Sequence, residues 1–249
     1  MKAILLAAGL GTRLRPLTDT VPKCLVPIAG HPLMGYWLSL FSKGEIERVL
    51  VNTHYLPQQV RTYIEASPWG KDVELVHEDE LCGTGGTILK NSHFIEGETF
   101  LVAHADNLTF FDLDDFQQHH KKQRERLGIA ITMMTFQTDS PQTCGIVELD
   151  ENGVVIGFHE KVENPPSDLA NGAVYIFEPE VLSFIKSLNK SFVDISNDVL
   201  PEFMGKISTF HNNTYLRDIG NQESLKQAEH DIATLPTLIR ARDDLWASL

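Results

Sequence analysis

Positive charge is scarce in this sequence. Its 249 residues include 21 Lys and Arg against 34 Asp and Glu, which gives a formal net charge of -13 at pH 7. Nucleic acids and anionic membranes are bound mainly through clustered basic side chains, so this balance excludes a general surface for either partner. A small phosphorylated ligand needs only a local group of basic residues, and it stays compatible with the composition.

Cysteines are few, and long apolar runs are absent. Cys24, Cys82 and Cys144 are widely spaced and form no Cys-x-x-Cys pair. This spacing excludes a disulfide framework and a zinc knuckle, and it is typical of a reducing compartment. The first apolar run, residues 3–8, is too short for a signal sequence, and no run reaches transmembrane length. We therefore expect a cytoplasmic protein without a membrane partner.

The periodicity of apolar residues predicts an α/β fold. Strand-length apolar runs alternate with segments of helical spacing, which is the order of βαβ units with parallel strands. Strands are expected at residues 3–6, 49–51, 73–76 and 100–103, and helices at 32–43, 57–66, 85–90 and 113–126. A β-rich part follows at 129–136, 146–149, 154–158 and 173–177, with further helices at 179–186 and 222–234 and a strand at 215–219.

The turn after the first strand is the most informative local feature. Gly9 and Gly11 permit positive φ and close backbone approach, and Arg13 and Arg15 add guanidinium groups that suit phosphoryl oxygens. A dinucleotide fingerprint would need a third glycine at Leu14, and a P-loop would need a Gly-Lys pair that neither glycine provides. Both motifs are excluded. An ordinary tight turn stays open as an alternative, and the basic residues favour phosphate.

Several segments, in order along the chain, closely resemble the sugar-1-phosphate nucleotidylyltransferases. They are residues 9–14, 22–28, 78–87, 105–107, 160–161, 171–172 and 218–220. Three positions depart from the family's usual pattern: Ala105 replaces a glycine, Val162 replaces a proline, and Asn221-Gln222 replaces Thr-Pro. None of these departures removes a charged group, so the reaction class implied by the resemblance is unaffected.

The resemblance implies a Rossmann-like, three-layer nucleotidyltransferase domain with a mainly parallel central sheet and a smaller β-rich sugar-binding insertion. One domain would span residues 1–249. Its parts would be a nucleotide-binding half at 1–128, a sugar-phosphate-binding half at 129–220 and C-terminal helices at 221–249. Members of the family often form homo-oligomers, so self-association is a further expectation.

The implied reaction is nucleotide-sugar synthesis, as used in polysaccharide biosynthesis. A sugar 1-phosphate would attack the α-phosphorus of a nucleoside triphosphate, releasing pyrophosphate and forming an NDP-sugar. The loop of sequence Leu-x-Gly-Thr-Gly-Gly at 81–86 resembles GTP-dependent mannose- and heptose-1-phosphate guanylyltransferases. Uridylyl- and thymidylyltransferases are alternatives. A catalytically silent regulatory subunit is another, although such relatives typically lose the basic or metal-binding residues that this chain retains.

The resemblance also assigns roles to individual residues. Arg13, Lys23 and Lys161 would be catalytic: Arg13 at the β- and γ-phosphates, Lys23 near the α-phosphate and Lys161 at the sugar phosphate. The nucleotide would be bound by Leu6, Ala8, Gly9, Gly11, Thr12, Arg13, Glu78, Gly83 and Thr84. The sugar phosphate would be bound by Gly145, Glu160, Lys161 and Asn171.

Two aspartates are candidate ligands for Mg²⁺. Asp106 follows the strand at 100–103 and Asp218 follows residues 215–217, so in a parallel sheet both would lie at carboxyl ends of strands. Hard oxygen ligands suit Mg²⁺, which completes its shell with phosphate oxygens and water. Either aspartate alone is better explained as a turn or helix-cap residue, and only the joint pattern favours a metal site. The ten histidines form no zinc pair, and we interpret them, His119 and His120 included, as surface residues.

Overall fold

The computed structural model describes residues 1–44, 46–95 and 97–247. These form two compact units that interleave along the chain. Unit 1 comprises Met1–Ile4, Cys82–Ala103 and Asp114–Asn213, and unit 2 comprises Leu5–Leu81, His104–Leu113 and Thr214–Leu249. The subdivision at residues 128 and 220 stays a prediction. The predicted C-terminal part, 221–249, includes residues 248 and 249, which lie outside the described residues.

Unit 1 is built around one long central strand, β11 (Leu169–Phe177). It pairs antiparallel with β6 (Phe100–His104), β8 (Ile131–Gln137) and β9 (Gly145–Leu149). β9 continues antiparallel into β10 (Val155–Glu160), and β12 (Ile207–His211) adds to β8 in parallel. The β-rich pattern predicted after residue 128 is thus present, and its strands are antiparallel around β11.

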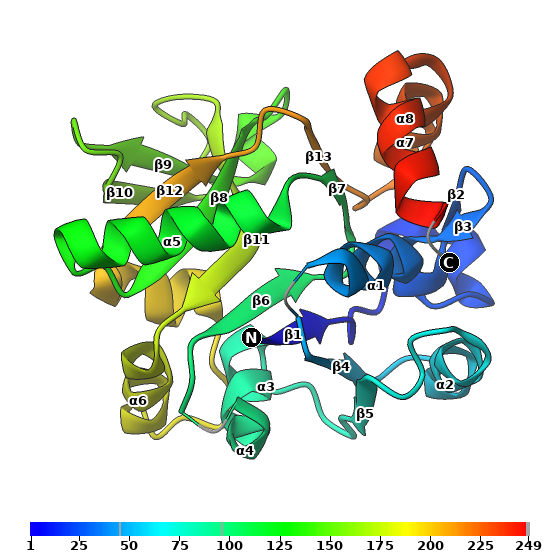
Figure 1. Cartoon of the computed structure of the whole chain (residues 1–249), viewed down its shortest axis with the longest axis horizontal. Coiled ribbons are helices and arrows are strands. Elements are labelled where there is room, and N and C mark those ends of the chain that lie inside the picture. The colour runs from blue at the N-terminus through cyan, green and yellow to red at the C-terminus, as the bar shows by residue number, and fades with distance from the viewer. Residues whose placement is uncertain (45, 96, 248–249) are drawn as a thin grey trace. The chain divides into compact units, whose positions relative to one another are not determined.

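The helices of unit 1 end or begin close to the predicted limits. They are α3 (Thr84–Lys90), α4 (Ser92–Ile95), α5 (Leu113–Leu127) and α6 (Pro179–Ser187), with shorter helical turns at Pro141–Thr143, Ile195–Val199 and Leu200–Phe203. Figure 1 shows α5 along β12, and the Phe116 and Phe210 rings of these elements lie 5.2 Å apart.

One histidine on α5 corrects the surface interpretation. His120 is 2% exposed, and its Nδ1 and Nε2 lie 2.8 Å from Thr132 Oγ1 and Glu178 Oε1. A neutral imidazole can be buried because both ring nitrogens find partners, one as donor and one as acceptor. Because His120 is surrounded by charged residues in the sequence, its burial could not be predicted from the local pattern.

Unit 2 contains the first half of the βαβ pattern. The last two residues of β1 (Lys2–Leu6) belong to it, and β4 (Arg48–Thr53) pairs in parallel with β5 (Val73–His77). Two small antiparallel ribbons join β2 (Pro27–Ile28) to β3 (His31–Pro32) and β7 (Asn107–Phe110) to β13 (Tyr215–Asp218). Short 3-10 turns cover Thr12–Leu14, Leu17–Asp19 and Lys23–Leu25.

The helices of unit 2 enclose a core that is mainly aliphatic and also contains several aromatic side chains. They are α1 (Leu33–Lys43), α2 (Pro57–Ala66), α7 (Gln222–Thr234) and α8 (Pro236–Trp246). Almost every residue of α1 is buried, Tyr36 and Trp37 included, as its nearly uninterrupted apolar sequence requires. Figure 1 shows α7 and α8 next to each other near the C-terminus.

The predicted α/β class with a central sheet is confirmed. Parallel pairing follows the βαβ rhythm at β4 and β5, where α2 connects the strands. Of the described helices, none is both long and apolar enough to cross a membrane.

Candidate active site

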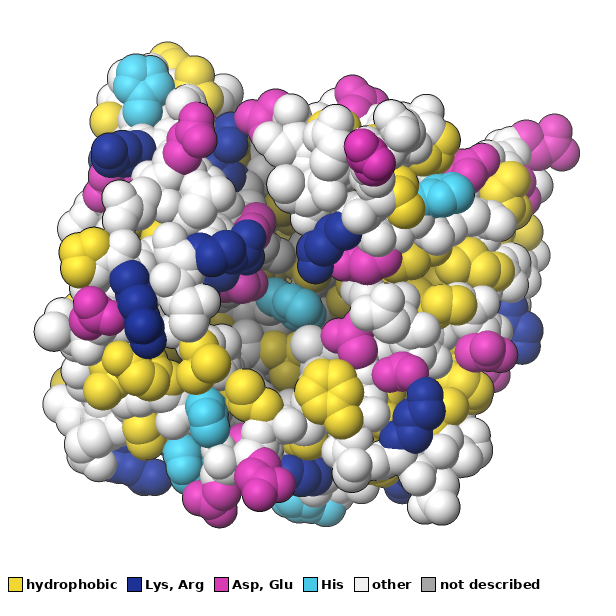
Figure 2. Space-filling model, turned by 180° about the vertical axis from the view of Figure 1, so that it is seen from behind, with side chains coloured by type: hydrophobic (Ala, Val, Ile, Leu, Met, Phe, Trp, Pro, Cys, Tyr) yellow, Lys and Arg dark blue, Asp and Glu magenta, His cyan; other side chains and the backbone are white. Residues whose placement is uncertain are grey.

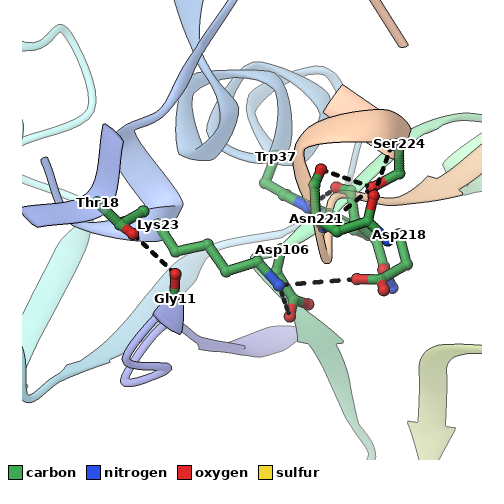
Figure 3. A network of polar contacts seen from close by, with 9 residues as sticks. Gly11, Thr18, Lys23, Trp37, Asp106, Asp218, Asn221 and Ser224 are labelled. Carbon is green, nitrogen blue, oxygen red and sulfur yellow. Dashed lines mark hydrogen bonds and ion pairs between the residues drawn. The ribbon is translucent and has the colours of Figure 1, made fainter. Parts of the chain in front are cut away.

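The glycine turn after β1 has the backbone conformation that its sequence suggests. Gly11 has φ +64°, which favours glycine, and its carbonyl oxygen accepts from Thr18 Oγ1 at 2.7 Å (Figure 3). A Cβ on Gly11 would lie 3.0 Å from Thr18 Cγ2 and 3.1 Å from Lys23 Cβ. The second glycine is therefore required both by its φ and by the close packing of Thr18 and Lys23.

Lys23 brings together the predicted basic and acidic groups of unit 2. Its Nζ lies 2.6 Å from Asp106 Oδ2 and 3.7 Å from Asp218 Oδ1 (Figure 3). The Lys23 side chain is only 8% exposed, whereas those of Asp106 and Asp218 are 36% and 51% exposed. A buried ammonium thus lies behind two carboxylates that solvent can reach.

The aspartates meet through a connection that the sequence did not predict. β13 is not part of a parallel sheet. It pairs antiparallel with β7, so that Asp218 lies opposite Asn107, and Ile219 N–H donates to Asp106 O at 2.9 Å. The expected arrangement at two parallel strand ends is therefore wrong for Asp218, because antiparallel pairing brings the end of β13 to the start of β7.

Three further hydrogen bonds fix this corner of unit 2. Trp37 Nε1 on α1 donates to Asn107 O at 2.8 Å, which holds the residue next to Asp106. Downstream of Asp218, the Asn221 side chain accepts from Ser224 N–H at 2.8 Å, and Asn221 N–H donates to Ser224 Oγ at 3.2 Å. This capping box starts α7, so the departure from Thr-Pro at this position supplies a helix cap.

The two carboxylates differ in their acidity. Partial loss of hydration raises the pKa of Asp218, and the nearby charge of Asp106 raises it further against the lowering effects of Lys23 and Arg13. Burial also acts to raise the pKa of Asp106, but the positive charges of Lys23 and His104 outweigh it and hold this pKa below its usual value. Two carboxylates that repel each other at close range attract a cation between them.

The residues present fit a hard divalent cation delivered with its substrate. Among the described residues, no cluster of three or more His, Cys, Asp or Glu could hold a metal ion by itself. Mg²⁺ is usually held by one or two carboxylates together with phosphate oxygens and water. Asp106 and Asp218 match that donor set, whereas a permanent, fully protein-bound metal does not match it.

The remaining predicted nucleotide residues lie in different surroundings. Gly9 and Thr12 are exposed, Ala8 is buried, and Leu6 O accepts from Ala105 N–H at 2.9 Å. Arg13 is exposed in the turn. Glu78, directly after β5, is only 4% exposed.

The glycine loop of unit 1 is built by close backbone approach. Gly85 and Gly86 N–H donate to Val193 O at 2.8 and 3.2 Å, and Val193 N–H donates to Cys82 O at 3.0 Å. Gly83 has φ +80°, and a Cβ there would lie 2.4 Å from Val193 O. Thr84 Oγ1 accepts from Ile195 N–H at 2.8 Å. These glycines are thus explained by the segment packed on them.

The predicted sugar-phosphate residues gather at β9, β10 and β11 in unit 1. Glu160 lies opposite Gly145 across the β9/β10 pair, and a Cβ on Gly145 would lie 2.6 Å from Glu160 Oε2. Lys161, with φ +50°, turns the chain at the end of β10, and its Nζ lies 2.9 Å from Glu160 Oε1. The Lys161 side chain is 65% exposed. A glycine at 145 therefore leaves room for the Glu160 carboxylate.

Asn171 belongs to the same group through an irregularity in β11. Its Oδ1 accepts from Ala173 N–H at 2.9 Å, and its Nδ2 donates to Tyr175 Oη at 2.6 Å. Ala173 has φ +52° within the register shift of the strand. Burial raises the pKa of Tyr175, and the charge of Glu160 adds to this effect, which agrees with a common environment for Tyr175, Asn171 and Glu160.

Three residues of these sites were not predicted: Thr18, Asn52 and Tyr175. Thr18 is 1% exposed and holds the glycine turn, and Tyr175 is 1% exposed and holds Asn171. Asn52 is 3% exposed and binds the backbone directly after β1. Each lies in a stretch of ordinary strand or turn composition, so no local pattern distinguishes it from a core residue.

Comparison with known proteins gives one family match and many relatives. The family described as nucleotidyl transferase matches residues 2–234. Mannose-1-phosphate guanylyltransferase of Mycobacterium tuberculosis is 32% identical over 235 residues, which cover 92% of this chain and 64% of the relative. UTP-glucose-1-phosphate uridylyltransferase of Synechocystis is 32% identical over 219 residues, which cover 82% and 55%. This chain therefore spans between 55% and 64% of the length of these relatives.

Solved structures share the fold. A Bacillus anthracis protein assigned as a glucose-1-phosphate thymidylyltransferase has a TM-score of 0.85 at 20% identity, covering 94% of this chain and 96% of that protein. HddC from Yersinia pseudotuberculosis, complexed with GMP-PN, has a TM-score of 0.75 at 24% identity, covering 93% and 99%. At such low identity these likenesses establish the fold alone.

Proposed function

This chain belongs to the nucleotidyl transferase family, and from that premise we propose that it transfers a nucleotidyl group to a sugar 1-phosphate. The observation that carries the proposal is the Lys23, Asp106 and Asp218 group beside the glycine turn of unit 2. In this proposal a sugar-phosphate oxygen bonds to the α-phosphorus of a nucleoside triphosphate. The bond from that phosphorus to the bridging oxygen breaks, and pyrophosphate leaves with the electron pair.

The residues of unit 2 would bind and align the triphosphate. Arg13 would contact the β- and γ-phosphates, where its planar guanidinium suits the charge of the leaving pyrophosphate. Lys23 would supply a positive charge at the α-phosphate. Asp106 and Asp218 would hold Mg²⁺, which when bound neutralises the phosphate oxygens and polarises the reacting phosphorus.

The residues of unit 1 would bind the sugar 1-phosphate. Lys161 is 65% exposed and pairs with the neighbouring Glu160, and because an exposed ion pair contributes little, its ammonium can turn to a phosphate at small cost. Beside Gly145, the Glu160 carboxylate would accept hydrogen bonds from sugar hydroxyls. The Asn171 amide would donate to such hydroxyls or accept from them. No general base is required, because a phosphate monoester is already ionised at neutral pH and alignment supplies much of the rate.

Guanine is the base that we favour, with GDP-mannose or a GDP-heptose as the product. The mannose-1-phosphate guanylyltransferase relative and the Leu-x-Gly-Thr-Gly-Gly loop support this choice. Glucose-1-phosphate thymidylyltransferase of Streptomyces griseus, 30% identical over 193 residues, supports the pyrimidine alternative, as does the Synechocystis relative. A silent regulatory subunit is disfavoured because the chain retains the basic and metal-binding residues that such relatives lose, namely Arg13, Lys23, Lys161, Asp106 and Asp218.

The surface charge supports small phosphorylated substrates. On the face shown in Figure 2, Lys and Arg side chains lie next to Asp and Glu rather than in one continuous basic area. With a net charge of -13, this distribution favours a local phosphate site over binding of nucleic acid.

A pyrophosphate-release screen tests the proposal. The purified chain is incubated with Mg²⁺, each of GTP, UTP, dTTP, CTP and ATP, and a panel of hexose and heptose 1-phosphates. We expect release that requires both substrates, fastest with GTP. Binding of a triphosphate without release from any pair would instead identify a regulatory protein, and faster release with UTP or dTTP would replace guanine as the base.

A further inference from the structure

One buried amide in unit 2 connects the carboxyl ends of β1, β4 and β5. Asn52, on β4, is 3% exposed. Its Oδ1 accepts from Ala7 N–H, directly after β1, at 2.7 Å, and its Nδ2 donates to Glu78 Oε1, directly after β5, at 3.0 Å. The side chain therefore binds both a backbone group of the glycine turn's first residues and a buried carboxylate.

The chemistry of these partners determines which way the amide points. A peptide N–H only donates and a carboxylate only accepts, so the carbonyl of Asn52 must face Ala7 and its NH₂ must face Glu78. Aspartate has the same shape but no donor, and serine is too short to reach both partners. Asparagine is thus the residue type that satisfies both contacts at this position.

Glu78 is held from its backbone as well as from its tip. Its N–H donates to Thr53 O at 2.8 Å, and His54 Nδ1 lies 2.7 Å from Glu78 O, which can only accept. A carboxylate that is 4% exposed needs donors to offset its loss of hydration. The end of β4 therefore supplies a backbone acceptor, an imidazole donor and the Asn52 amide to one residue.

We propose that Asn52 is a positioning residue of the triphosphate site, acting through Glu78 and the backbone after β1 without touching the substrate. The proposal rests on the proposed function and on the sequence prediction that Ala8, Gly9 and Glu78 bind the nucleotide. Ala7 directly precedes Ala8 and Gly9 in the chain. The hydrogen bond from Ala7 N–H to Asn52 therefore sets the direction in which the backbone enters the glycine turn. The bond at Glu78 sets the position of the carboxylate.

The same geometry restricts the base that this site takes. An ionised carboxylate only accepts, so Glu78 suits a base whose Watson–Crick edge has a ring N–H. Guanine, uracil and thymine have that donor, whereas the corresponding ring nitrogen of adenine and cytosine is an acceptor. Asn52 holds the Glu78 carboxylate in the place that this discrimination needs.

Nucleotide titrations of position 52 variants test the proposal. Binding of GTP, UTP, dTTP and ATP with Mg²⁺ is measured by calorimetry without sugar phosphate, for the wild type and for Asn52→Asp and Asn52→Ser. Asn52→Asp keeps the acceptor for Ala7 but places a second carboxylate against Glu78, so we expect about 10-fold or greater loss of affinity for the preferred base at pH 7.5.

Asn52→Ser adds no charge beside Glu78, so its affinity loss should be smaller than that of Asn52→Asp. In turnover, both variants should raise KM for the triphosphate and leave kcat at saturation and KM for the sugar phosphate nearly unchanged. Asn212→Asp is the matched control, because Asn212 is buried to a similar degree, at 7% exposure, within unit 1. It should lower the melting temperature and leave triphosphate affinity unchanged.

Wild-type affinity in a folded Asn52→Asp or Asn52→Ser protein would overturn the positioning role. A loss of affinity equal to that of Asn212→Asp would also overturn it, because the effect would then be one of general stability. Wild-type protein that binds a triphosphate without releasing pyrophosphate would refute the proposed function, while the comparison of affinities would still decide the role of Asn52.

Discussion

Two lysines, one in each unit, pair with carboxylates, but one lysine is buried and the other is exposed to solvent. Lys23 in unit 2 is 8% exposed and lies within 3.7 Å of two aspartates, whereas Lys161 in unit 1 is 65% exposed and pairs with the adjacent Glu160. A charge removed from water interacts strongly with its partners, while an exposed pair is screened and contributes little. The contrast indicates a fixed charge group in unit 2 and an adaptable one in unit 1.

This difference suits two kinds of ligand. A triphosphate with Mg²⁺ carries concentrated charge of both signs, and a site whose charges are already in place loses little order when it binds. A sugar 1-phosphate carries one phosphate on a ring of varied hydroxyls, and an exposed lysine with a flexible four-carbon side chain can adjust to it. We therefore expect substitutions in the two units to affect different substrates.

The largest effect is expected at the fixed group. Asp106→Ala should lower magnesium-dependent pyrophosphate release at least about 1,000-fold, because it removes a metal ligand and leaves Lys23 with one carboxylate. Circular dichroism should show a folded protein. Asp243→Ala, which removes an aspartate 61% exposed and paired with Arg242, is the control and should keep wild-type activity. Near-normal turnover of Asp106→Ala would show that the aspartates do not hold the metal.

The next effect concerns stability in unit 1. Burial, with Arg124 and Lys121, lowers the pKa of His120 from 6.5 to about 4. Between these values the unfolded chain binds the proton and the folded one does not, so the free energy of unfolding should fall by up to about 3 kcal/mol as pH drops from 6.5 to 4. Urea unfolding of His120→Gln should show a weaker dependence on pH in this range.

His230→Gln serves as the control for that series, since His230 is exposed on α7. Its unfolding curve should follow the wild type at every pH. If the slopes of wild type and His120→Gln agree, protonation of His120 is not what weakens unit 1 in acid.

A smaller effect is expected at the adaptable lysine. Lys161→Ala should raise KM for the sugar 1-phosphate about 10-fold and leave triphosphate affinity unchanged, as the loss of one charge-assisted contact implies. Lys190→Ala is matched, because Lys190 is 51% exposed and pairs with Asp198 in unit 1. It should have no effect on either KM. The reverse result, with weaker triphosphate binding in Lys161→Ala, would exchange the roles assigned to the two units.

The smallest effect is expected where a hydroxyl supports the glycine turn. Thr18→Val removes the bond to Gly11 O and should raise KM for the triphosphate a few-fold, corresponding to about 1 kcal/mol. Thr209→Val removes the equivalent bond to Gly153 O, at 3.0 Å in unit 1. It should cost similar stability without changing KM. Equal kinetic effects of both variants would show that the turn needs no such support.

The strands and helices with clear periodicity were predictable from the sequence. The βαβ order, the β-rich part and the helix after Asn221 agree with the structure within a few residues. The short ribbon of β7 and β13 was not foreseen as a pair, because Asn107 and Asp218 are more than 100 residues apart and no local pattern encodes their antiparallel register. The burial of His120 was not predicted for a related reason. Its hydrogen-bond partners, Thr132 and Glu178, come close to it only in the folded structure.

The same distinction applies to the candidate site, where some residues were predictable from the sequence and others were not. Charged residue types and glycines in a fixed order are local chemistry, and they pointed to Gly11, Lys23, Asp106 and Lys161 before any fold was known. Which carboxylates share a lysine, which lysine is buried, and which neutral residues support them depend on distances between segments far apart in the chain. Hydrogen bonds such as those of Asn52 and Tyr175 have no periodic signature, since one side chain satisfies partners that only folding brings near.

The sequence by itself determined the family and the α/β class, because both follow from short motifs and from the periodicity of apolar residues. The tertiary structure decided how charge is distributed between the units. It buried Lys23 between Asp106 and Asp218 and left Lys161 in solvent, although both residues carry the same group. The physical reason is that burial and proximity are properties of packing, and identical side chains differ in energy according to the water and the charges around them.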